Sequence, residues 1–224
     1  MEASGPGLED AGAGAQAGWV DDDVRAEFPE LRLLSVAVDR GSGRSSRGVK
    51  HRLRGMSDRF RGSHAVTMRQ DPVPWAYRVF YRHIGLDPDA DRTPVEAAAL
   101  ERLIQGAFKS RNLLDDALTI ALVETGVPIW ALDADRVQGA LGIRTTSRPA
   151  RLGRDAAATG LAAGRLVVAD ERSALAVLFG ELAPGHGVTQ HTQRMRLFTV
   201  QVAGVPQIHV EEALYDCVSV LTDG

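Results

Sequence analysis

Three polar residues lie at helical spacing in one of the most apolar stretches of the chain, residues 112–126. Asn112, Asp116 and Thr119 are four and then three residues apart, so a helix places them on one face. The rest of the stretch is mostly apolar, as in a buried helix. Buried polar groups cost free energy unless they are hydrogen-bonded, so these side chains need partners or a ligand. We therefore predict that they form one wall of a substrate pocket.

No strong catalytic signature accompanies this stripe. The sequence has no Gly-rich loop ending in Lys-Ser/Thr, no Gly-x-Ser-x-Gly motif and no cysteine pair at zinc spacing. His186 and His191 are five residues apart, which is a poor metal-binding spacing on a helix or a strand. The single cysteine, Cys217, lies in an apolar helical pattern and is predicted to be a buried, inert thiol. We expect no metal and no cofactor.

The charges are distributed unevenly along the 224 residues. Residues 41–63 hold seven Lys/Arg and one acidic residue, a net charge of +6, whereas the other residues sum to −9. A basic segment on an acidic body is typical of a polyanion contact, and a solvated loop is the alternative interpretation. A smaller Arg-rich segment, residues 144–154, follows in a Pro/Gly-containing loop. The residues predicted to contact the polyanion are Arg44, Arg47, Lys50, Arg52, Arg54, Arg59, Arg61, Arg148 and Arg151.

Length and local signals favour a single α+β domain, residues 19–224, behind a disordered Gly/Ala-rich tail, residues 1–18. Expected helices cover 72–81, 93–105, 112–126 and 210–221. Expected strands cover 33–38, 129–132, 140–145, 166–169, 174–179 and 195–202, and 41–63 is expected to be a basic loop. Helices thus gather in the first half and strands in the second, which favours a mixed or antiparallel sheet. No stretch is apolar enough to cross a membrane, and one cysteine suits a reducing cytoplasm.

Several of these segments resemble the B3/B4 editing domain of the phenylalanyl-tRNA synthetase beta chain. That family has a run Val-Asp-Val-Thr-Asn, a helix, and then Gly-Gln-Pro-x-His-Ala-Phe-Asp, and residues 116–119 and 126–133 fall on these two runs. Free-standing relatives of the domain carry Arg-x-Ser/Thr-x-Glu-Ala, Asn-Pro-Leu-Val-Asp and Gly-x-Leu-Val-x-Ala-Asp, which resemble residues 92–97, 112–116 and 164–170. The resemblance runs from about Asp21 to the C-terminus and implies the B3/B4-like fold.

The resemblance implies further pocket residues. Thr189 and Thr192 fall where the family has a Val-Thr-x-x-Thr turn beside its pocket, so His191 and Thr192 are placed at the pocket. Trp130 stands where the family has a histidine, and Phe198 stands near its acidic reader of the tyrosine hydroxyl. A pocket without that carboxylate is expected to lack selectivity for tyrosine. Trp130 as a core residue is the alternative.

The family's activity implies a free-standing deacylase that hydrolyses the ester of a mischarged tRNA in trans. Because that ester is already activated, positioning a water and the carbonyl can suffice, and the catalytic residues stay unassigned. The alternative is a non-catalytic protein that binds tRNA or aminoacyl-tRNA and delivers it to a biosynthetic partner. A small-molecule sensor or scaffold that has lost RNA binding is a third interpretation. The expected partner is tRNA, with no membrane or DNA partner, and the sequence leaves the oligomeric state open.

Overall fold

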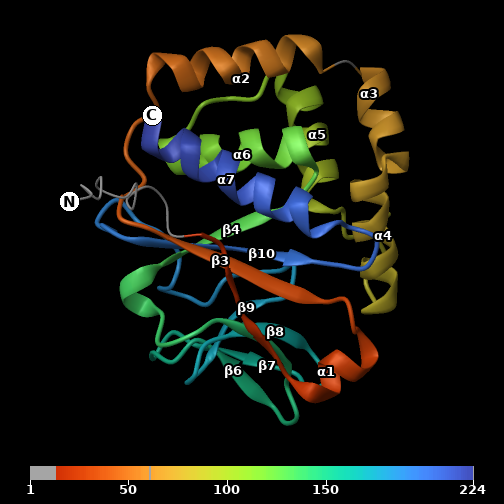
Figure 1. The fold of residues 1–224 in the computed structure, drawn as a ribbon, viewed down its shortest axis with the longest axis vertical. Helices are drawn as coiled ribbons and strands as arrows, with labels where there is room; N and C mark the ends of the chain where they lie inside the picture. Colours follow the sequence, from red (N-terminus) through yellow and green to blue (C-terminus); the bar gives the residue numbers. More distant parts are fainter. Residues whose placement is uncertain (1–13, 61, 224) are drawn as a thin grey trace, which may run out of the picture.

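The computed structural model describes residues 14–60 and 62–223 and has a helical layer above two stacked sheets (Figure 1). The helices are α1 (Asp22–Glu27), α2 (Arg47–Arg59), α3 (Gly62–Thr67), α4 (Pro72–His83), α5 (Pro94–Gln105), α6 (Leu113–Thr125) and α7 (Gln207–Asp223), with short 3-10 turns η1 (Met68–Gln70) and η2 (Ala134–Arg136). The strands are β1 (Gln16–Ala17), β2 (Trp19–Val20), β3 (Arg32–Val38), β4 (Ile129–Asp133), β5 (Gly142–Thr145), β6 (Ala150–Leu152), β7 (Thr159–Leu161), β8 (Leu166–Ala169), β9 (Ala174–Val177) and β10 (Met195–Gln201). The predicted α+β class with mixed and antiparallel sheets is confirmed.

The first sheet has the strand order β1-β3-β10-β4 and is antiparallel throughout. The second has the order β2-β5-β8-β9-β6-β7 and is mixed, because β2 runs parallel to β5 and β6 runs parallel to β9. In Figure 1 the first sheet lies between α6 and α7 on one side and the second sheet on the other. The first sheet is therefore the central layer of the molecule.

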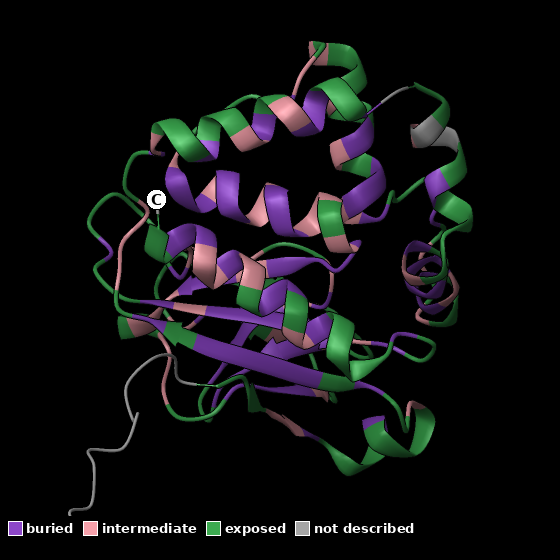
Figure 2. Ribbon diagram, turned by 45° about the horizontal axis from the view of Figure 1, so that its top comes forward, coloured by how far each residue is buried: buried purple, intermediate pink, exposed green. Residues whose placement is uncertain are grey.

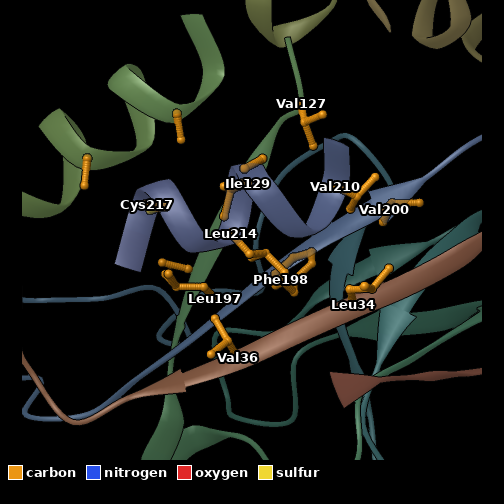
Figure 3. Packing of buried hydrophobic residues seen from close by; sticks show 14 of the residues in the cluster. Leu34, Val36, Val127, Ile129, Leu197, Phe198, Val200, Val210, Leu214 and Cys217 are labelled. Atoms are coloured by element: carbon orange, nitrogen blue, oxygen red, sulfur yellow. The ribbon is translucent and has the colours of Figure 1, made fainter. Parts of the chain in front are cut away.

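The main hydrophobic core lies around this central layer. In Figure 2 the long strands of the first sheet are mostly buried, whereas exposed residues gather on the outer sides of the helices. Figure 3 shows Val36 and Leu197 of the sheet close to Leu214 and Cys217 of α7. Cys217 is 0% exposed, and burial raises the pKa of its thiol to about 12. The prediction that Cys217 is buried is confirmed.

The predicted tail is wrong at its C-terminal end. Residues 1–13 lie outside the described residues, but β1 pairs with β3 and β2 pairs with β5, so this segment bridges the two sheets. Gly18 lies between them and donates its N–H to Leu33 O at 2.8 Å. A Cβ at Gly18 would lie 2.3 Å from Leu141 O, so the close approach requires glycine.

The predicted basic loop at 41–63 is also wrong, because most of it is helix α2. Ser46 caps the helix by accepting a hydrogen bond from Val49 N at 3.3 Å. Val49, Leu53 and Met56 recur at helical spacing and are buried. The sequence contains this apolar periodicity, but the Gly, Ser and Arg residues around it favoured the prediction of a loop.

Residues next to the helix ends cap the start of α5 and the end of α6. Thr93 and Glu96 form a capping box, and Glu96 also pairs with Arg78 at 2.5 Å. Both charged side chains are buried, so this pair fixes α4 against the start of α5. Gly126 ends α6 in the left-handed conformation, with φ 75°. Within the described chain, no helix has the length and apolar content needed to cross a membrane.

Candidate nucleic-acid interface

Helix α2 presents a basic face to solvent. Its buried residues point toward the protein, whereas Arg47, Lys50, His51 and Arg54 are exposed. These four residues follow the i, i+3, i+4, i+7 spacing that places side chains along one helix face. We call Arg47, Lys50 and Arg54 the α2 basic face. His51 lies in the same stripe and was not predicted as a contact residue, because its alignment with the three cations depends on the helical conformation of 47–59.

The cations of this segment differ in whether a carboxylate neutralises them. Arg52 points toward α6 and forms a bidentate ion pair with the carboxylate of Glu124. The hydrogen bond to Glu124 raises the pKa of Arg52, while partial burial acts in the opposite direction. In the part of the chain that the structure describes, Arg44, Arg47, Lys50, Arg54 and Arg59 form no ion pair. Five predicted contact residues thus have charges available to an anionic ligand, and Arg52 is engaged internally.

Two of the remaining predicted RNA contacts, Arg148 and Arg151, are not brought to this surface. Arg61 lies outside the described residues. Arg148 and Arg151 are exposed, but they lie at and beside β6, and Figure 1 places α2 and β6 at opposite ends of the molecule. Arg151 donates to Ala158 O at 3.0 Å. The two basic segments therefore do not form one continuous surface.

The polar stripe on α6 is largely satisfied by the protein itself. Asn112 caps the helix by accepting from Asp115 N at 2.9 Å, and its Oδ1 also accepts from Ser42 Oγ at 2.7 Å. Thr119 Oγ1 donates to Asp115 O at 2.8 Å. These bonds are local to the start of α6 and to the segment before α2.

Asp116 is the most strongly engaged member of the stripe and is only 1% exposed. Its carboxylate accepts hydrogen bonds from Ser45 Oγ at 2.5 Å, Ser110 Oγ at 2.6 Å and Arg111 N at 2.9 Å. Three donors meet the need for partners that a buried carboxylate has. Asp116 therefore ties two loops to the start of α6.

A small recess lies beside this stripe, between α5 and α6. Asp115, Asp116 and Thr119 line it, together with residues of α5 and of the loop that follows α5, and its volume is about 50 Å³. Small-molecule sites usually measure about 300–1,000 Å³. The recess has room for water molecules but not for an aminoacyl group in this conformation.

Trp130 and Phe198 lie on neighbouring strands in register and stack on each other, with ring centroids 5.7 Å apart. Phe198 is 2% exposed, and the edge of Phe179 contacts Trp130 at a centroid distance of 5.6 Å. Phe179 also contacts Tyr77 and Tyr81 of α4. The two predicted pocket residues are thus packed within an aromatic cluster that joins β4, β10 and α4.

His191 and Thr192 lie in the loop before β10. Thr192 is buried and donates to Asp133 Oδ2 at 2.7 Å, whereas the His191 side chain is exposed. Asp133 also caps the η2 turn by accepting from Asp135 N at 3.0 Å. A Cβ on Gly41 would lie 2.3 Å from Thr192 O, so this loop packs closely on the end of β3. In residues 14–60 and 62–223, no group of three or more His, Cys, Asp or Glu side chains could hold a metal ion.

Comparison with known proteins gives a distant relative. No protein-family model matches the chain. The phenylalanine–tRNA ligase beta subunit of Streptomyces avermitilis is 30% identical over 138 residues. The match covers 61% of this chain and 15% of the length of that subunit. The chain is therefore similar to a limited segment of a tRNA ligase beta subunit.

Proposed function

We propose that this chain binds tRNA through the α2 basic face. The observation that carries the proposal is the row of exposed cations on α2 that have no carboxylate partner among the described residues. Lys and Arg that neutralise phosphates release counterions, which makes this kind of contact favourable and salt-dependent. Arg47 and Arg54 are seven residues apart, about 10 Å along a helix. The row is therefore long enough to reach more than one phosphate of a strand.

Two further points support tRNA as the polyanion. The relative described above is the beta subunit of a tRNA ligase. The resemblance to the B3/B4 editing domain points to the same class of RNA. The residues outside 41–63 are acidic overall, which disfavours non-specific adhesion of the rest of the chain to a polyanion.

For the aminoacyl end, we favour a protein that binds aminoacyl-tRNA without hydrolysing it. The α6 stripe is engaged by internal hydrogen bonds, the recess beside it is small, and Trp130 and Phe198 fill space by stacking. These contacts leave little room for a substrate side chain at the predicted pocket.

Hydrolysis of a mischarged tRNA in trans is the second candidate. The observation in its favour is the exposed His191 imidazole beside the Thr192–Asp133 hydrogen bond, at the turn that resembles the family's pocket. An imidazole there can orient a water toward an activated ester. The same proposal includes a B3/B4-like fold for the chain from β1 onward and an aminoacyl-tRNA as the ligand.

One experiment separates these possibilities. A panel of mischarged tRNAs carrying labelled amino acids is incubated with the protein in excess, and ester loss is followed over time. A binder slows spontaneous ester loss or leaves it unchanged while retaining the tRNA on a filter, whereas a deacylase accelerates it and turns over. A variant with Arg47, Lys50 and Arg54 replaced by alanine should lose either effect. Retention of a DNA duplex of similar length as strongly as tRNA, or no retention of tRNA at low salt, would refute the proposal.

A further inference from the structure

A cleft of about 390 Å³ lies at the opposite end of the molecule from α2. The ends of α1, α4, β5 and β9 and the start of β8 surround it. Its volume falls in the usual range for small-molecule sites. Phe28 and Leu166 contribute to its apolar wall, and Glu27, His83, Thr145 and Arg165 to its polar part. None of the residues predicted from the sequence as site residues lines this cleft.

The charged groups of the cleft are not neutralised within the protein. Glu27 and Arg165 both line it and are exposed, yet they form no ion pair with each other or with any other described residue. His83 likewise has no ion-pair partner in the described part of the chain. A guanidinium and a carboxylate on one cleft, apart from each other, can each bind a group of opposite charge on the same ligand.

We propose that this cleft binds a small zwitterion with an apolar body, of the class of free amino acids with an apolar side chain. Arg165 binds the carboxylate, Glu27 binds the ammonium group, and Phe28 and Leu166 contact the apolar part. The apolar wall selects for the side chain of the ligand, and the two opposite charges select for its ammonium and carboxylate groups. This site does not depend on the proposed tRNA function, and RNA is absent from its test.

The test is isothermal titration calorimetry of the full chain with L-leucine. Two analogues each keep one charge: 4-methylpentanoate has only the carboxylate, and 3-methylbutylamine has only the ammonium group. Leucine should bind at one molecule per chain, and each analogue should bind at least about tenfold more weakly, as expected for the loss of one charged contact. Binding of either analogue as tightly as leucine would overturn the zwitterion assignment.

Substitutions place the binding in the cleft. Arg165→Gln and Glu27→Gln should each weaken leucine binding at least about tenfold. Arg172→Gln and Glu181→Gln are matched controls, because these side chains are exposed and do not line the cleft. The melting temperature of each variant verifies that it is folded. The absence of leucine binding at millimolar concentration, or equal binding by the cleft variants and the controls, would overturn the proposal.

Discussion

Replacing Arg47, Lys50 and Arg54 with alanine should greatly weaken tRNA binding while leaving the fold intact. Each lost phosphate contact makes the plot of log K against log salt less steep, reducing the magnitude of its negative slope by about 0.9 for a duplex and about 0.7 for a single strand. Three contacts therefore lower the slope by about 2.1 to 2.7. If the two binding constants meet at 1 M salt, the triple variant binds roughly 100- to 500-fold more weakly at 0.1 M.

Filter binding of tRNA between about 0.05 and 0.4 M salt measures this slope directly. The three side chains are exposed and lie within a helix, where alanine is favourable. Their replacement should change the free energy of unfolding by no more than about 0.5 kcal/mol each. A urea melt of the variant verifies this, so that weaker binding can be assigned to lost contacts.

Net charge is the main competing explanation, and a second triple variant controls for it. Arg32, Arg92 and Arg172 are exposed cations outside α2, and their replacement by alanine removes the same charge. This control should keep most of the affinity and nearly the original slope. Equal losses in the two triple variants would refute a local contact at α2, and so would an unchanged slope in the α2 variant. Arg52→Ala should have a smaller effect on binding than Arg54→Ala, because Arg52 already pairs with Glu124.

Four further outcomes follow from the packing and the ionisable groups. Asp116→Ala leaves one buried donor, Ser45 Oγ, and two part-buried donors without their acceptor and should cost about 1.5–3 kcal/mol in a urea unfolding titration. Trp130→Ala removes the ring stacked on Phe198 and should cost about 3–5 kcal/mol in the same titration, and any deacylation profile should be unchanged if the tryptophan serves only the core. Burial acts to raise the pKa of Asp170, but three backbone N–H donors and a guanidinium hold it below the usual value. The ionised Asp170 carboxylate therefore contributes its full stabilisation above about pH 4, and this stabilisation is lost as pH falls through the lower folded-state pKa. Asp170→Asn should be less stable than the wild type at neutral pH, and its free energy of unfolding should fall less on acidification. Cys217 should resist a thiol reagent in the native state and react at the rate of unfolding, because burial raises its pKa to about 12.

The sequence predicted the elements whose boundaries depend on local chemistry. The capping box at Thr93 and the left-handed Gly126 were readable because each acts within one turn of its helix. The strands β1 and β2 were not readable, because two-residue strands are ordered only by pairing with β3 and β5. The setting of Trp130 also depends on distant partners, since Phe179 reaches it from beyond β9. Local pattern alone could not decide between pocket and core at that position.

The polar stripe on α6 was expected to need partners or a ligand, and hydrogen bonds within the protein supply partners to its members. Asn112 and Asp116 were expected to need partners, and they have them, but the partners come from the segment that leads into α2. Ser42 donates to Asn112 and Ser45 donates to Asp116, while Leu113 N donates to Gly43 O at 3.2 Å. The start of α6 thus fixes the residues immediately before the α2 cap, Ser46. The buried carboxylate on α6 and the basic helix on the surface are therefore parts of one arrangement, in which the polar stripe orients α2.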